Sequence, residues 1–314
     1  MSQRPDDLVL TVGEALIDVV VSPDGQRTEH VGGSPANVAV GLASLGHPSR
    51  LTAYLADDER GRHLRTHLEG YGVQLTEGSL AAERTSTATA HLDGEGVATY
   101  DFDLAWRLGE QDLGGVGHLH TGSLAATVEP GGSAVVDLMA RARMAGATVS
   151  YDPNCRPTLM GRPEDARQRI EECVGRSDVV KASLEDLEWL YADAPALDVA
   201  REWGRLSPVL VVVTRGADGP LVHLPATGTT LELPAQQVEV VDTVGAGDSF
   251  MAGLLSGLLD TGLLGDAAAR ERLRRATGPD LDPALGRAVA AASWTVGRSG
   301  AAAPTRADLH LTST

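Results

Sequence analysis

The sequence is short of cysteine and of long apolar runs, and each shortage excludes a class of protein. Its 314 residues include only two cysteines, Cys155 and Cys173, too few for a disulfide framework or a zinc ligand set. No apolar run approaches the roughly 20 residues that a membrane-spanning helix needs. Residues 1–10 lack the apolar segment of a signal peptide. We therefore expect a protein of the reducing cytoplasm that has no membrane partner.

Positive charge is also scarce. The chain carries 43 acidic and 26 basic residues, giving a net charge of −17, and Lys181 is the only lysine. An acidic surface repels the phosphates of nucleic acids and of anionic lipids, so we expect no nucleic-acid partner. If the chain binds a nucleotide, the positive potential must be local and come from backbone N–H groups, a metal ion and a few arginines.

Short apolar segments alternate with amphipathic ones along most of the chain. The apolar segments are bounded by turn residues and predict buried strands of a mainly parallel sheet. The amphipathic segments between them predict helices, and this alternation is typical of a layered α/β domain. The predicted strands are 8–12, 51–54, 148–151, 178–180 and 209–213; the predicted helices are 35–45, 59–71, 133–145, 163–174 and 184–191.

Two segments break this alternation. Residues 17–31 and 85–103 each predict a pair of strands, joined by a turn at 22–25 in the first and at 93–96 in the second. Polar and apolar residues alternate in both, as in a sheet that has one face in water. We expect the two segments to form a small β-sheet lid, set apart from the main sheet.

The most specific chemical signal is Asp242–Phe250, which reads Asp-Thr-Val-Gly-Ala-Gly-Asp-Ser-Phe. Small residues before a helix, here Gly245, Ala246 and Gly247, let backbone N–H groups converge on one anion at the helix N-terminus. Such a cluster can stabilise the charge on a transferring phosphoryl group. A neighbouring carboxylate suits the attacking hydroxyl, so we predict that Asp248 is the catalytic base. A tight loop in which Asp248 only caps the helix is the simpler alternative.

Two motifs resemble the signatures of one enzyme family. Asp242–Phe250 resembles the C-terminal signature of the PfkB, or ribokinase-like, carbohydrate kinases, and Gly32–Ala39 resembles their N-terminal signature. Gly13–Asp18 is similar to the opening strand of the fructokinase and 2-keto-3-deoxygluconate kinase branch. The resemblance implies one kinase domain over residues 1–314 with a three-layer ribokinase-like α/β fold. In that fold, helices flank a mainly parallel central sheet, and a small β-sheet forms the lid.

The resemblance also implies an activity. It is the transfer of the γ-phosphoryl group of ATP to a hydroxyl of a small sugar, and a ketohexose such as fructose is the expected acceptor. The alternative acceptors are 2-keto-3-deoxygluconate, tagatose phosphate and a nucleoside; outside enzymes, the alternative is a silent sugar sensor. Retention of a base argues against the sensor, because sensing requires no proton transfer. In the family such lids often pair between subunits, which implies a homodimer through the lid.

Polar residues near the N-terminus are expected at the sugar. Asp18 follows an apolar strand, and its carboxylate can accept hydrogen bonds from two hydroxyls. Gly32 and Gly33 let the backbone approach a ligand closely, and Asn37 offers both a donor and an acceptor. The resemblance assigns all four to the sugar. A turn cap for Asp18 and a solvated helix position for Asn37 are the alternatives.

A second polar group follows the strand predicted at 148–151. The carboxyl ends of strands are where ligands bind in open α/β sheets. Asp152, Asn154 and Arg156 match an Asp-x-Asn-x-Arg element of the same branch, which implies contacts with the sugar, or with the transferring phosphate for Arg156. Arg107 resembles a lid-side arginine of that branch and is also assigned to the sugar.

The nucleotide and Mg²⁺ are placed by resemblance. Lys181 and Ser183 follow the strand predicted at 178–180. Residues 181–186 stand at the place of the family's Asn-x-x-Glu or Ser-x-x-Glu motif, where this chain has Ser183 and, instead of glutamate, Asp186. Aspartate is one methylene shorter, which favours contact with Mg²⁺ through water. Lys181 is predicted to contact phosphate, with a solvated charge as the alternative.

A further loop and a further ion complete the predicted nucleotide site. Thr214, Gly216 and Gly219 resemble a nucleotide loop of the form Thr-x-Gly-x-x-Gly, for which a plain strand–hairpin turn is the alternative. The resemblance implies that backbone carbonyls of Asp242 and Thr243, with others near residues 293–300, bind a monovalent cation such as K⁺.

Overall fold

The computed structural model describes residues 8–95 and 98–311, and in this part of the chain the main sheet has nine strands. They are β1 (Leu8–Val12), β4 (Ser49–Thr52), β5 (Gln74–Leu75), β8 (Val116–Gly122), β9 (Thr148–Asp152), β10 (Val179–Ser183), β11 (Leu210–Thr214), β12 (Leu221–Leu224) and β13 (Thr229–Glu232). Their spatial order is β13–β12–β11–β10–β9–β8–β1–β4–β5. The strands from β11 to β5 pair in parallel, whereas β12 pairs antiparallel with both of its neighbours.

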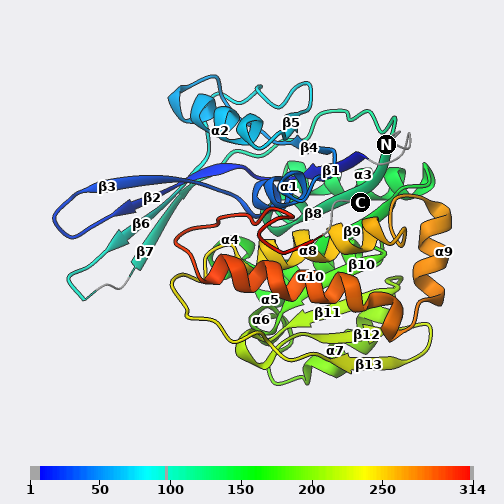
Figure 1. Ribbon diagram of the computed structural model, residues 1–314. Helices are drawn as coiled ribbons and strands as arrows, with labels where there is room; N and C mark the ends of the chain where they lie inside the picture. Colours follow the sequence, from blue (N-terminus) through cyan, green and yellow to red (C-terminus); the bar gives the residue numbers. More distant parts are fainter. Residues whose placement is uncertain (1–7, 96–97, 312–314) are drawn as a thin grey trace.

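Helices cover both faces of this sheet (Figure 1). One face is covered by α3 (Gly131–Met144), α5 (Pro163–Val174), α6 (Leu184–Tyr191) and α7 (Ala196–Gly204). The other is covered by α1 (Ser34–Ser44), α8 (Ala246–Asp260), α9 (Ala267–Arg275) and α10 (Gly278–Val296). Along β11, Val211 and Val213 join the first core, whereas Leu210 and Val212 join the second. Burial on both sides explains the continuous apolar run of this strand and confirms the predicted three layers.

A second, smaller sheet projects from the body (Figure 1). It contains β3 (Arg27–Gly32), β2 (Leu16–Val21), β6 (Thr87–Leu92) and β7 (Ala98–Asp103), in that order. β2–β3 and β6–β7 are antiparallel hairpins, and parallel pairing of β2 with β6 joins them. Ile17 and Val19 are buried in a core shared with α1 and α2 (Glu59–Gly70). We call these four strands the lid.

The strand β8 is central in the sheet but was not predicted. It carries two histidines, His118 and His120, that are buried against the neighbouring strand β9. His118 forms hydrogen bonds of 2.8 Å with Thr148 and Ser150, and His120 forms one of 2.9 Å with Ser150. Burial lowers the pKa of both histidines to about 3, so they are neutral. Neutral imidazoles that are hydrogen-bonded to hydroxyls can lie in a core. Because histidine counts as polar, the sequence pattern of this strand did not indicate that it is buried.

Candidate active site

Asp248 lies in the first turn of α8, near the carboxyl ends of the parallel strands of the main sheet. The predicted small-residue loop precedes it, and Gly245 adopts a left-handed conformation with φ of 74°. A Cβ at Gly245 would lie 2.5 Å from the Cβ of Ala301, so close packing also requires glycine there. Among the described residues, no oxygen accepts from the N–H of Gly247 or of Asp248. These N–H groups at the start of a 15-residue helix can bind an anion.

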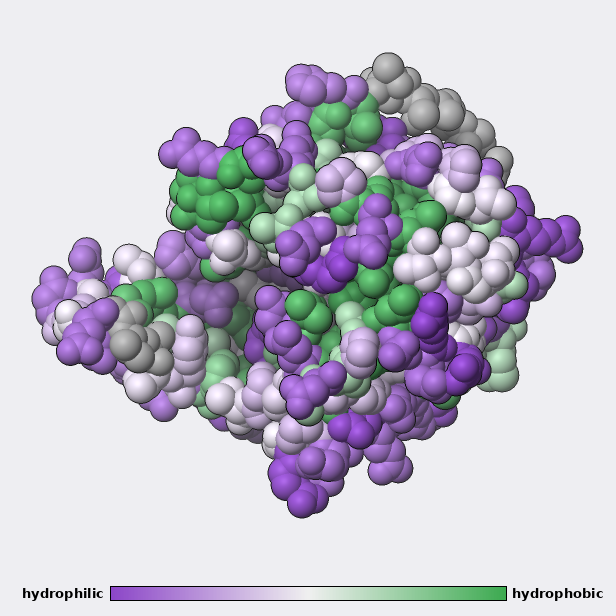
Figure 2. Space-filling view, turned by 90° about the horizontal axis from the view of Figure 1, so that it is seen from below, coloured by the Kyte–Doolittle hydropathy of each residue, from purple (hydrophilic) through white to green (hydrophobic). Residues whose placement is uncertain are grey.

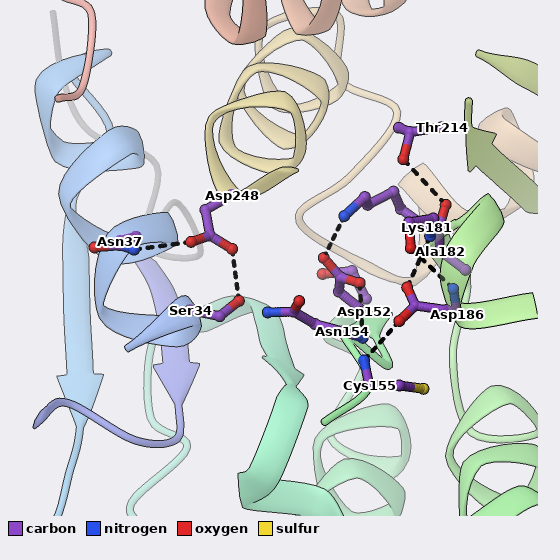
Figure 3. A network of polar contacts seen from close by, with 12 residues as sticks. Ser34, Asn37, Asp152, Asn154, Cys155, Lys181, Ala182, Asp186, Thr214 and Asp248 are labelled. Atoms are coloured by element: carbon purple, nitrogen blue, oxygen red, sulfur yellow. Dashed lines mark hydrogen bonds and ion pairs between the residues drawn. The ribbon is translucent and has the colours of Figure 1, made fainter. Parts of the chain in front are cut away.

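The Asp248 carboxylate is buried between two neutral donors from α1 (Figure 3). The hydroxyl of Ser34 donates to Oδ1 at 2.6 Å, and the side-chain amide of Asn37 donates to Oδ2 at 2.8 Å. Ser34 is the first residue of α1 and Gly33 occupies the cap position, so the Ser34 hydroxyl binds Asp248 rather than capping the helix. Asn37 was predicted to bind the sugar; its partner in this structure is the predicted base.

Asp18, on lid strand β2, lies against the backbone of β3. A Cβ at Gly32 would lie 2.0 Å from Oδ2 of Asp18, so only glycine admits the carboxylate at this position. Gly33 has φ of 107°, and a Cβ there would lie 2.4 Å from the carbonyl oxygen of Glu14. Burial raises the pKa of Asp18, while the positive charge of Arg156 acts to lower it. Gly32 thus admits the Asp18 carboxylate and Gly33 admits the Glu14 carbonyl, while the approach of both glycines to a ligand stays a prediction.

Asp152 and Lys181 form a buried ion pair beside the loop of Gly245, Ala246 and Gly247 (Figure 3). The ammonium of Lys181 lies 2.7 Å from Oδ2 of Asp152, and both side chains are almost inaccessible to solvent. A Cβ at Gly247 would lie 3.1 Å from the same ammonium, which places Lys181 next to the N-terminus of α8. Burial raises the pKa of Asp152 to about 6 despite this pairing. Asp152 was predicted at the sugar, and the structure gives it a different partner.

Asp186 joins two loops through its two carboxylate oxygens. Oδ2 accepts from the N–H of Ser183 at 2.8 Å, and the Ser183 hydroxyl accepts from the N–H of Asp186 at 3.0 Å, which makes a capping box for α6. Oδ1 accepts from the N–H of Cys155 at 2.6 Å. Each oxygen keeps a second lone pair, which can accept from a metal-bound water.

The loop after β9 carries the remaining predicted residues of its motif. Asn154 is held in a left-handed conformation, with φ of 36°, and its N–H donates to Asp152 at 3.2 Å. The Arg156 guanidinium is exposed and donates to Oδ1 of Asn154 at 2.8 Å. Arg107 is exposed on the chain that leaves the lid. Figure 2 shows a hollow in the surface where the lid joins the body.

The predicted nucleotide loop follows β11. The Thr214 hydroxyl donates to the carbonyl of Ala182 at 3.4 Å, which ties the loop to β10. Gly216 and Gly219 both have positive φ, of 52° and 74°. A Cβ at Gly219 would lie 2.0 Å from the carbonyl oxygen of Leu233, whereas Gly216 borders open space. Packing therefore explains the second glycine, and Gly216 is the one that leaves room for a ligand.

The segments assigned to a monovalent cation lie side by side. The N–H groups of Val241 and Asp242 both donate to the carbonyl of Val296, at 2.9 and 3.1 Å. Oδ2 of Asp242 accepts from the N–H of Gly300 at 2.8 Å. The carbonyl of Thr243 accepts from the N–H of Ala246 at 3.3 Å. These hydrogen bonds bring residues 241–243 next to residues 296–300, as the predicted cation site requires.

Comparison with known proteins identifies the family. A model of the pfkB family carbohydrate kinases matches residues 6–308. The chain belongs to the pfkB family. A pfkB-type relative, the fructokinase of Klebsiella pneumoniae, is 35% identical over 270 residues, which cover 83% of this chain and 87% of the relative. Of the described helices, none is long and apolar enough to cross a membrane.

Two solved structures show the same pfkB fold. A fructokinase with bound ATP from Xylella fastidiosa has a TM-score of 0.84 and 28% identity, and the match covers 97% of both chains. A fructokinase double mutant from Vibrio cholerae O395, in fructose, ADP and potassium ion bound form, has a TM-score of 0.78 and 28% identity, again over 97% of both chains. The predicted family and ribokinase-like fold are confirmed.

Proposed function

We propose that this pfkB kinase transfers the γ-phosphoryl group of ATP to a hydroxyl of fructose, with Asp248 as the general base. The observation that carries the proposal is a carboxylate held by two neutral donors, Ser34 and Asn37, next to the N-terminal N–H groups of α8. In the reaction, the sugar hydroxyl gives its proton to Asp248 as its oxygen bonds to phosphorus, and the bond to the ADP oxygen breaks.

The sugar is proposed to bind between the lid and the start of α1. Asp18 and Gly32 approach this space from the lid, while Gly33 and Asn37 approach it from the start of α1. Arg107, Asn154 and Arg156 are proposed to approach the sugar or the phosphoryl group from the opposite wall. The exposed Arg156 guanidinium bonds only to its own loop, so it can turn toward an anion without breaking a contact to another element. Bound sugar would also displace water, which competes as an acceptor.

The phosphoryl group is proposed to lie between the α8 N-terminus and Lys181. The loop of Gly245, Ala246 and Gly247 supplies N–H groups, and the ammonium next to Gly247 supplies a full positive charge. Asp152 then positions the ammonium rather than the sugar. Burial acts to lower the pKa of Lys181, but the Asp152 carboxylate offsets this and holds the pKa above its ordinary value, so the lysine stays charged.

The nucleotide is proposed to extend from that point across the strand ends of β10 and β11. Ser183 and Thr214 lie at these ends, with Gly216 and Gly219 in the loop that follows. Mg²⁺ would be held by the phosphates and by water bonded to Asp186, and it would neutralise charge on the phosphates. Carbonyls of Asp242 and Thr243 are the proposed ligands of K⁺; the Vibrio fructokinase structure contains a potassium ion.

A homodimer through the lid and a cytoplasmic location complete the proposal. The outer lid strands β3 and β7 have unpaired edges, which can pair with another sheet. Tyr100, 59% exposed, stacks on Phe102 on β7 and offers an apolar surface there. ATP as the donor and two free cysteines both suit the cytoplasm.

A kinase assay over a panel of acceptors tests the proposed function. The panel contains fructose, other ketoses, aldoses, 2-keto-3-deoxygluconate and nucleosides, each with ATP and Mg²⁺, and ADP formation is measured. We expect the highest kcat/KM with fructose and little ATP hydrolysis without an acceptor. Clear preference for a nucleoside or a keto acid would reject fructose but keep the kinase. Binding of sugar with no phosphorylation of any acceptor would identify a sensor.

A further inference from the structure

Glu14 is a carboxylate at the candidate site that the sequence motifs did not assign. It lies in the three-residue connection between β1 and β2, where the main sheet passes into the lid. Its backbone packs so closely under Gly33 that a Cβ there would lie 2.4 Å from the Glu14 carbonyl oxygen. The residue therefore lies at the junction of the lid, the start of α1 and the carboxyl end of β1.

The Glu14 side chain is only partly satisfied. The Ser123 side chain lies beside this carboxylate and acts to lower its pKa, whereas Oε2 is buried and has no hydrogen-bond partner among the described residues. The charged groups that act on it are Arg156, from the loop after β9, and Asp248, from α8. Burial raises the pKa of Glu14 to about 7. A buried carboxylate oxygen with no donor is unfavourable, and native structures contain few of them.

Ser123, beside Glu14, has an unusual backbone conformation. Ser123 follows β8 directly, is buried, and has φ of 51°, which is rare for a residue other than glycine. Backbone strain of this kind is concentrated at functional sites, where it holds a group in position. An unpaired oxygen and a strained neighbour, two independent observations, thus coincide between the proposed base and the proposed sugar residues.

We propose that Glu14 is a further acceptor-binding residue, whose carboxylate accepts a hydrogen bond from a sugar hydroxyl other than the one that is phosphorylated. This inference rests on the proposed sugar kinase function. Glu14 is only partly buried as a residue, and the terminal torsion of glutamate is soft, so the carboxylate can turn its unpaired oxygen toward the ligand. A hydroxyl at that point replaces the missing donor, and an acceptor without it leaves Oε2 unpaired. Glu14 thus selects polyols.

The contact is tested by asking whether the loss of kcat/KM caused by removing a sugar hydroxyl depends on the residue at position 14. We would measure kcat/KM with fructose and with its monodeoxy analogues for the wild type, Glu14→Gln and Glu14→Ala. In the wild type, one deoxy analogue should lose about 10- to 100-fold beyond the others, the range of a hydrogen bond to a charged group. Glu14→Ala should lose a similar factor with fructose and show no further loss with that analogue. Glu14→Gln keeps an acceptor oxygen and should lie between them, with KM for ATP unchanged.

The outcome that overturns the inference is a set of deoxy penalties that are the same in the wild type and in both variants. If Glu14→Ala does not fold, the coupling measured with Glu14→Gln decides. Glu69→Gln, at an exposed glutamate of α2, makes the same chemical change away from the site and should leave every penalty unchanged. If the wild type does not phosphorylate fructose, the fructose proposal fails separately. The same cycle is then run with the acceptor that is turned over and its deoxy analogues.

Discussion

Two buried aspartates near the α8 N-terminus have opposite surroundings. Asp248 is held by a hydroxyl and an amide, both neutral, whereas Asp152 is held by the ammonium of Lys181 at 2.7 Å. A neutral donor fixes the position of a carboxylate without supplying a compensating charge. An ammonium supplies that charge and opposes the rise in pKa that burial causes. The comparison shows how one site can contain a carboxylate suited to take a proton and another suited only to hold a cation in place.

The most severe change to this comparison is Asp248→Asn. Asparagine keeps the size and can still cap the helix, but it cannot take the proton of the sugar hydroxyl. We expect kcat to fall by about 10²- to 10⁴-fold, the usual contribution of a general base, with the melting temperature nearly unchanged. The measurement is kcat at saturating sugar and ATP. A near-normal kcat would show that Asp248 is only a cap.

Lys181→Met removes the cation of the second aspartate, Asp152. It leaves the Asp152 carboxylate buried without a cation, so we expect the free energy of unfolding to fall by about 3–5 kcal/mol. Adding Asp152→Leu should restore most of this loss, without restoring activity, because the positive charge is still missing. Denaturant unfolding measures both variants. Arg205→Met, which removes an exposed ion pair with Glu202, is the control and should change stability little. A similar loss in Lys181→Met and Arg205→Met would contradict a buried pair.

Glu14 is a third carboxylate to compare with the two aspartates, and no cation is bonded to it. Glu14→Gln tests the effect of its charge on stability. Because the pKa of Glu14 is raised from 4.5 to about 7, the unfolded chain ionises first, and folding becomes less favourable as pH rises between these values. Well below pH 4.5 the residue is neutral in both states and has no effect. The glutamine variant should therefore match the wild type at about pH 3 and be more stable by about 3 kcal/mol at pH 8.

Denaturant unfolding at the two pH values measures this difference. A glutamine variant that is less stable than the wild type at pH 8 would show that Glu14 has a structural role and would contradict its place at the site. Together with the weaker sugar kinetics expected above, a gain in stability would mark Glu14 as a residue that is kept for function.

Ser34→Ala is the mildest change, because it removes one neutral donor from the base. A neutral hydrogen bond contributes about 0.5–1.5 kcal/mol, so we expect kcat to fall by about 2- to 10-fold with KM for ATP unchanged. Ser133→Ala is the matched control, since Ser133 also lies in the first turn of a helix and donates to a carboxylate, Glu129, at 2.7 Å. An equal effect of both variants on kcat would remove Ser34 from the site.

Much of the fold could be predicted because local signals agree with the tertiary structure. The bounds predicted for β1, α5 and α6 are those observed. For α5, a proline at its first position marks the start. The central strand β8 escaped prediction because His118 and His120 read as polar, and their burial depends on hydroxyls of β9 that no local pattern reveals.

The sequence predicted which residues form the candidate site, but not which of them contact one another. The motifs pointed to Asp248, Asn37, Asp152 and Lys181, yet the contacts among them join positions far apart in the chain. Ser34 and Asp248 are 214 residues apart, and Asp152 and Lys181 are 29 apart. Opposite charges at the ends of adjacent parallel strands were the signal that could have paired Asp152 with Lys181. For Ser34, helix position favoured a cap, and only the packing of α1 against α8 gives it another acceptor.

The scarcity of lysine gives the chain an unusual chemical property. Its surface cations are arginines, which do not react with acylating reagents as amines do, and its one lysine is only 3% exposed. No other lysine competes for such a reagent. Acylation of Lys181 therefore requires the residues that cover it to move, so its rate measures their movement, and a ligand that holds them in place would slow the labelling. The protein thus carries a built-in probe of its own active-site opening, which mass spectrometry can read without any engineered label.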